Sequence, residues 1–174
     1  MDVTLVLTHD CNLGCGYCYA GAKFQRKMTP ETATKSIDLA FSDSPRQVQI
    51  SFFGGEPLLA YEQLVVSAKH ARTTAKERGV ELKMSVTTNG TLLDDAKAAE
   101  LETLGVYVAL SIDGTREAHD SGRPLMGGGS SFDKVVRGLD VLVRRGVPFE
   151  TISVVTPQNA HLVGETAEYL FKAG

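Results

Sequence analysis

The chain alternates two hydrophobic patterns, and this alternation limits most strongly how it folds. Short apolar runs rich in β-branched residues occur at 3–8, 47–53, 82–87, 107–112 and 149–155. Each run has the length and composition of a strand. Apolar residues recur at helical spacing between and after these runs, in the segments 33–41, 64–75, 93–104, 132–143 and 162–170. The sequence therefore predicts five successive strand–helix units.

The helix boundaries carry their own signals. Thr29 and Pro30 form an N-cap followed by proline at the first helical position, which predicts a helix start. Gly79, Gly105 and Gly146 each follow the last apolar residue of a helical segment. Glycine is the usual residue just after a helix, so we expect three helices to end there.

Strands that are separated by helices run parallel and are joined by right-handed crossovers. Both a doubly wound sheet and part of a (β/α) barrel satisfy this rule, and periodicity alone leaves the two open. A closed barrel needs eight units. With five, we predict an α/β fold that forms a partial TIM-type barrel, an open arc of parallel strands, or else a piece of a longer protein.

Charge and hydropathy exclude several classes of partner. The chain has 18 basic and 21 acidic residues, a formal charge of -3, and no basic stripe, so nucleic acid is not an expected partner. No apolar run approaches the ~18 residues of a membrane span. The first residues resemble a strand and lack the basic region of a signal peptide. We expect a cytoplasmic protein without a membrane partner.

Polar residues and glycines follow the predicted strands. Ligands bind at the carboxyl ends of parallel strands. Four of the five segments found there carry glycine beside a polar residue, and glycine permits close approach of a ligand to the backbone. We therefore expect one shared site at one rim. Its segments are 8–19, 54–57, 88–91 and 111–114.

All three cysteines, Cys11, Cys15 and Cys18, lie in the first of these loops with the spacing C-x3-C-x2-C. This crowding and the odd number argue against a disulfide framework. Thiolates are soft ligands for zinc or iron–sulfur clusters. Structural zinc takes four ligands, and His9 is the one candidate for the fourth. A [4Fe-4S] cluster held by three thiolates instead leaves one iron open for an external molecule.

The cysteine loop, with Tyr17 before the third cysteine, resembles the motif of the radical S-adenosylmethionine (SAM) enzymes. Further segments in the same order are similar to the branch of anaerobic sulfatase-maturating enzymes and other peptide modifiers with a SPASM-type C-terminal domain. These segments are 53–57, which is similar to the GGEP motif, 88–93, 111–114, His119-Asp120, Arg123 and 132–135.

The resemblance implies roles for individual residues. Cys11, Cys15 and Cys18 would hold the cluster. The backbone at Tyr17 would meet the adenine of SAM, and the Gly54-Gly55-Glu56 segment would meet its amine. Ser111 and Arg123 would bind its carboxylate, while Asp113 would serve the ribose or orient Ser111. Asn89 is an expected cofactor contact within a turn.

The resemblance also implies an activity. A reduced cluster would cleave SAM to a 5′-deoxyadenosyl radical that abstracts hydrogen from a peptide or protein, with flavodoxin or ferredoxin as electron donor. Residues 1–174 would form a core that lacks the sixth strand–helix unit and any SPASM domain, and no catalytic residue is identified. The alternatives are a non-catalytic metal or redox module and an inactive truncated homologue.

Overall fold

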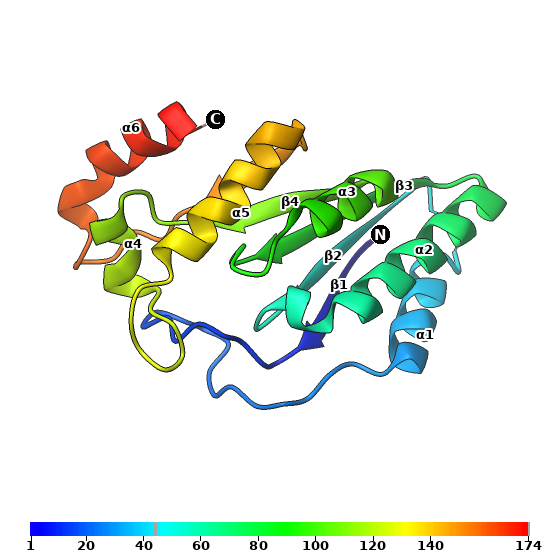
Figure 1. The fold of residues 1–174 in the computed structure, drawn as a ribbon. Coiled ribbons are helices and arrows are strands. Elements are labelled where there is room, and N and C mark those ends of the chain that lie inside the picture. Colours follow the sequence, from blue (N-terminus) through cyan, green and yellow to red (C-terminus); the bar gives the residue numbers. More distant parts are fainter. Residues whose placement is uncertain (44, 174) are drawn as a thin grey trace.

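The computed structural model describes residues 1–43 and 45–173. Its centre is one sheet of five parallel strands, in the spatial order β1-β2-β3-β4-β5 (Figure 1). The strands are β1 (Asp2–Thr8), β2 (Gln47–Gly54), β3 (Glu81–Thr88), β4 (Val106–Ser111) and β5 (Phe149–Ile152). All five predicted strands are thus present.

Helices follow each strand, and α1, α2, α3 and α5 lie side by side along one face of the sheet (Figure 1). The α-helices are α1 (Pro30–Ala40), α2 (Tyr61–Arg78), α3 (Asp95–Leu104), α4 (Arg116–Gly122), α5 (Phe132–Arg145) and α6 (Val163–Ala173). Two short 3-10 helices, η1 (Pro57–Ala60) and η2 (Ala160–Leu162), precede α2 and α6. No helix within the described ranges is both long and apolar enough to cross a bilayer.

The strand order separates the two architectures that the sequence left open. Each strand pairs with the next one along the chain, so every right-handed crossover advances in the same direction. Such crossovers place successive helices on the same face, whereas a doubly wound sheet reverses its order at a switch point. The prediction of an open arc of a TIM-type barrel is confirmed.

The sheet buries one face against the helices. In β2, Val48, Ile50 and Phe52 are fully buried, while Gln49 between them is exposed. The register sets Ile50 beside Val3 and Met84, which extends the apolar rows across the sheet. Apolar residues from both layers form the core. Its largest members include Leu5, Leu7, Ile37, Phe41, Leu64, Leu101, Leu110 and Leu142.

The predicted helix boundaries are confirmed. The hydroxyl of Thr29 accepts a hydrogen bond from the amide of Thr32 at 3.2 Å, and Pro30 opens α1. Gly79, Gly105 and Gly146 cap α2, α3 and α5 in the left-handed conformation.

Two elements differ from the prediction. Strand β5 ends at Ile152 and not at residue 155, because Ser153 and Val154 bond to Ile112 and Asp113, just after β4, in place of continuing the ladder. Helix α4 was not predicted, because its seven residues carry no apolar stripe. Thr115 caps its first turn.

Candidate cofactor site

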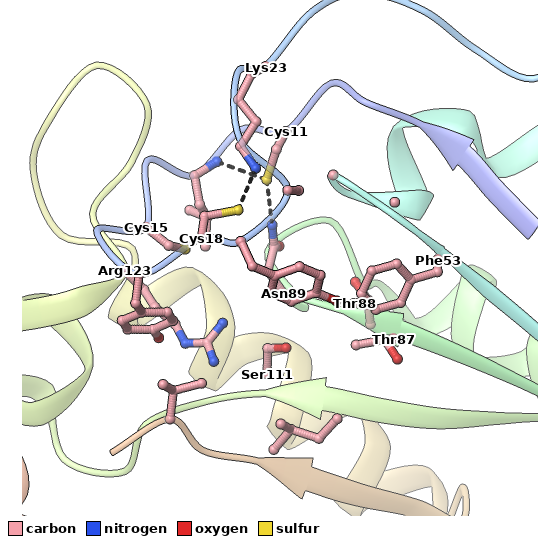
Figure 2. Close-up of a pocket in the computed structure, with 18 residues that line it drawn as sticks. Cys11, Cys15, Cys18, Lys23, Phe53, Thr87, Thr88, Asn89, Ser111 and Arg123 are labelled. Atoms are coloured by element: carbon pink, nitrogen blue, oxygen red, sulfur yellow. Dashed lines mark hydrogen bonds between the residues drawn. The ribbon is translucent and has the colours of Figure 1, made fainter. Parts of the chain in front are cut away.

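A cavity of about 340 Å³ lies at the carboxyl ends of the strands (Figure 2). It brings together most of the residues that the sequence assigned to a cofactor. These are Cys11, Cys15, Tyr17, Cys18, Gly54, Gly55, Asn89, Ser111 and Arg123. Two others, Glu56 and Asp113, are buried but do not line the cavity. The loops after four strands therefore meet at one rim.

The cysteine loop is attached to a segment more than 100 residues away. The amides of Gly14 and Gly16 donate to the carbonyls of Pro124 and Gly122 at 2.8 and 3.0 Å. The amide of Met126 donates to the carbonyl of Asn12 at 3.0 Å. These bonds hold the cysteine backbone against the segment that carries Arg123.

The glycine pair after β2 supports the cysteine loop from its other side. The amide of Gly55 donates to the carbonyl of Thr8 at 2.8 Å. A Cβ atom on Gly55 would lie 2.1 Å from the carbonyl oxygen of Asp10, and one on Gly54 would lie 2.3 Å from that of Thr8. Only glycine permits this approach of the two loops.

The three cysteines have different surroundings, and none forms a disulfide. Sγ of Cys11 accepts from the amide of Leu13 at 3.4 Å, and burial raises the pKa of Cys11 and of Cys15. Burial alone would also raise the pKa of Cys18. The hydrogen bond from Nζ of Lys23, 2.8 Å from its Sγ (Figure 2), acts together with the Ala20 backbone and the charges of Lys23 and Arg123 to outweigh burial and lower that pKa.

Asn89 joins the loop after β3 to the cysteine loop. Its Nδ2 donates to Oδ1 of Asn12 at 2.9 Å and lies 3.9 Å from Sγ of Cys11. The hydroxyl of Thr91 donates to Oδ1 of Asn89 at 2.7 Å and accepts from Nδ2 of Asn12 at 2.8 Å. The three polar side chains thus close a ring of hydrogen bonds beside the first cysteine.

Glu56 lies beneath the cavity floor. Its carboxylate accepts from the amides of Leu58 and Asn89 at 2.9 and 2.7 Å and from the hydroxyl of Thr88 at 2.7 Å. Burial raises the pKa of this fully buried group, while the three donors act in the opposite direction. The side chain therefore caps η1 and fixes the end of β3.

Arg123 reaches the cavity from the end of α4. Its side chain is buried, and Oδ2 of Asp113 accepts a hydrogen bond from its Nε at 3.0 Å. Its guanidinium also lies 5.3 Å from the ring centroid of Tyr17, whose hydroxyl donates to the same carboxylate oxygen. In the described part of the chain, no protein acceptor engages its Nη atoms.

A buried histidine supports this arrangement. Nδ1 of His119 accepts from the amide of Asp113 at 3.3 Å, and Nε2 faces the hydroxyl of Ser131 at 2.9 Å. That hydroxyl donates to the carbonyl of Arg123 at 2.6 Å. Burial lowers the pKa of His119 to about 4, so the ring is neutral, with its proton on Nε2.

The geometry does not favour a zinc site built with His9. The His9 ring stacks on Phe24, with centroids 4.4 Å apart, and does not line the cavity. Among residues 1–43 and 45–173, no three His, Cys, Asp or Glu side chains are grouped to hold a single metal ion.

The donor set fits an iron–sulfur cluster. Three thiols line one cavity, and two cationic side chains, Lys23 and Arg123, line it with them. Positive charge and N–H donors stabilise thiolates and cluster sulfurs.

Several side chains of the site were not assigned from the sequence. Lys23, Asn12 and Thr91 received no role there, and His119 was left without one. Lys23 could have been recognised from its positive charge, because it lies only five residues after Cys18. The other contacts join residues far apart in the chain.

A comparison with family models matches residues 5–170 to the radical SAM superfamily. The chain is 35% identical over 158 residues to Fe-coproporphyrin III synthase of Methanosarcina barkeri, covering 88% of this chain and 36% of that protein. It is 28% identical over 166 residues to the cysteine-type anaerobic sulfatase-maturating enzyme of Clostridium perfringens (strain 13 / Type A), covering 91% and 45%.

A solved structure described as native anSMEcpe with bound AdoMet and Cp18Cys peptide superposes with a TM-score of 0.89 and 27% identity. The match covers 98% of this chain and 47% of that one. The chain thus spans less than half the length of each of these three proteins.

Proposed function

Because the chain belongs to the radical SAM superfamily, we propose that it forms the core of an enzyme that binds a [4Fe-4S] cluster and SAM. The enzyme generates a 5′-deoxyadenosyl radical for hydrogen abstraction from a peptide or protein. The observation that carries this proposal is the gathering of three free cysteines around one cavity at the carboxyl ends of the strands.

Cys11, Cys15 and Cys18 are the proposed cluster ligands. Three thiolates leave one iron without a protein ligand, which gives SAM a place to bind. When bound, the reduced cluster supplies the electron that splits SAM into methionine and the 5′-deoxyadenosyl radical. The protein residues orient the reactants and exclude water.

Ser111 and Arg123 are the proposed partners of the SAM carboxylate. Both line the cavity, and the Nε bond to Asp113 leaves the two Nη atoms of Arg123 directed at a ligand. A guanidinium binds a carboxylate with two parallel hydrogen bonds. In the described residues the hydroxyl of Ser111 has no protein partner, so it is available as a third donor.

The other predicted residues act mainly as supports in this proposal. Gly54 and Gly55 bring backbone carbonyls to the cavity wall as acceptors for the SAM amine, while Glu56 holds that wall from below. Tyr17 offers its backbone to the adenine. Asp113 orients Arg123 from behind the cavity lining.

A peptide substrate is favoured by the likeness to anSMEcpe, which was solved with a peptide bound. Abstraction is selective only where the substrate carbon is held close to the radical, so we place the substrate on the same rim. The likeness to Fe-coproporphyrin III synthase favours a tetrapyrrole precursor of an iron porphyrin as the second candidate substrate. This chain aligns with less than half of each relative, which supports the proposal that residues 1–174 are one part of a longer protein.

Anaerobic reconstitution tests the proposal. The chain is expected to take up about four irons and four sulfides, to show a paramagnetic signal after dithionite, and to release 5′-deoxyadenosine from SAM. A matched variant with all three cysteines changed to alanine should remain colourless. Reconstituted wild type without iron, or with one zinc and no SAM cleavage, would refute the proposal.

The substrate is tested separately, in the longest available form of the protein. Cysteine- or serine-containing peptides and a tetrapyrrole precursor of an iron porphyrin are each supplied with deuterium in place of hydrogen on carbon. Transfer of deuterium into 5′-deoxyadenosine from a peptide supports a peptide substrate, and transfer from the tetrapyrrole alone overturns it.

A further inference from the structure

Lys23 places its ammonium group against a cysteine sulfur. Nζ lies 2.8 Å from Sγ of Cys18, and the side chain lines the cavity shared with the other two cysteines (Figure 2). We propose that Lys23 raises the reduction potential of the cluster by donating a charged hydrogen bond to the sulfur of Cys18. This inference rests on the proposed function, since it requires a cluster at the three cysteines.

The local backbone brings Lys23 back over Cys18. A turn at Tyr19 and Ala20 follows the third cysteine, and Gly21 then adopts a φ of +69°. This left-handed conformation is open to glycine at little cost. The chain turns back here, so the Lys23 ammonium contacts the sulfur of Cys18 while the side chain remains partly exposed.

The segment after Lys23 is anchored to the end of β1. The Phe24 ring stacks on that of His9, with an angle of 15° between the planes. The carbonyl of Arg26 accepts from the amide of His9 at 3.1 Å and from the hydroxyl of Thr8 at 3.2 Å. Lys23 therefore lies between two fixed points, the turn and this anchored segment.

Lys23 differs from the other basic residues of its segment in its contact with a sulfur atom. From Cys11 to Thr29 the sequence has no acidic residue and three basic ones, at positions 23, 26 and 27. Of these three, only Lys23 donates to a sulfur in the described structure. Lys27 is exposed and serves as a nearby comparison.

The expected effect follows from electrostatics. Reduction adds one negative charge to the cluster and its thiolates. A cation in hydrogen-bond contact with a ligand sulfur stabilises that reduced form more than the oxidised form, because the attraction grows with the charge of its partner. The contact therefore makes the electron easier to accept, and its removal makes the cluster harder to reduce.

Potentiometric titration of the reconstituted chain without SAM, followed by paramagnetic resonance, tests the inference. We expect the Lys23→Met cluster to be roughly tenfold harder to reduce, which equals a fall of about 59 mV for one electron. Lys23→Gln, which keeps a neutral donor, should fall less, and Lys23→Arg should remain near wild type. Lys27→Met removes the same charge without the sulfur contact and should leave the potential unchanged.

The outcomes separate the two proposals. A wild-type chain that takes up no cluster defeats the proposed function itself. If wild type holds a cluster and both neutral Lys23 variants match its potential, only the role of Lys23 fails. It fails equally if Lys27→Met lowers the potential as far as Lys23→Met. Because SAM is absent from the titration, a role of Lys23 in binding SAM would not produce the expected shift.

Discussion

The Nε atom of Arg123 donates to Oδ2 of Asp113 across 3.0 Å, with 8% and 1% of the two side chains exposed. Asp113 lies two residues after β4 and Arg123 directly follows α4, so one buried ion pair joins the end of the sheet to the segment that holds the cysteine loop. The pair thereby couples the stability of the fold to the geometry of the site.

Asp113→Asn should unfold the chain at a clearly lower urea concentration. It leaves the Arg123 guanidinium buried without a counter-charge, and breaking such a pair typically costs about 3–5 kcal/mol. Asp133→Asn is the matched control, because its pair with Arg116 is exposed to solvent. The control should unfold close to wild type. Equal midpoints for all three proteins would show that the buried pair does not hold the site.

Gly55→Ala should both destabilise the chain and reduce its iron content after reconstitution. The added methyl group would lie 2.1 Å from the backbone oxygen of Asp10, so the loop that precedes Cys11 must move. Overpacking of this kind costs about 1–3 kcal/mol. Gly16→Ala lies in the cysteine loop with nothing within 4 Å of the new methyl group, so it should behave as wild type. Iron analysis and urea unfolding check both variants.

Asn89→Asp should weaken retention of the cluster. The change replaces the Nδ2 donor, which faces Oδ1 of Asn12 and Sγ of Cys11, with an oxygen that repels both. Iron remaining after timed exposure to a chelator measures the effect, and a loss roughly tenfold faster is expected. Asn159→Asp makes the same substitution in the connection after β5, where Nδ2 donates to Val154, and should not change the rate. Equal rates for both variants would contradict the prediction.

The stability of the chain should fall between pH 6.5 and about 4 because of His119. Burial and the nearby Arg123 lower its pKa from 6.5 to about 4, while Asp113 and Asp120 act in the opposite direction. Within this window the unfolded chain binds a proton that the folded chain does not, so stability is lost as the pH falls. The full shift corresponds to roughly 3 kcal/mol.

Urea unfolding at pH 7 and pH 5 measures this contribution. His119→Gln should lower stability at pH 7, because the bonds to Asp113 and Ser131 weaken, but it should show a shallower decline toward pH 5 than wild type. The exposed His161 provides the control, and His161→Gln should keep the wild-type slope. Parallel slopes for wild type and His119→Gln would rule out the assigned pKa.

Local sequence patterns were sufficient for the succession of strands and helices, whereas the strand order in the structure decided between a doubly wound sheet and a partial barrel. Alternating strand and helix periods, the Thr29-Pro30 start and the three glycine stops depend on residues within a few positions of one another, so they can be recognised without a structure. The spacing of the cysteines indicated the cluster for the same reason. By contrast, the end of β5 depended on contacts from Ser153 and Val154 to Ile112 and Asp113, the two residues just after β4, which no local pattern reveals.

The sequence by itself determined the succession of units, the cysteine loop and the set of polar residues at the strand ends. Only the tertiary structure decided which of those residues face the cavity. Glu56 and Asp113 turned inward, because backbone amides and a guanidinium from distant segments satisfy their carboxylates. Lys23 reached Cys18 because the following segment is anchored to β1. Such contacts form only when the chain packs. They cannot be recognised from the sequence, because the residues that make them lie far apart along it.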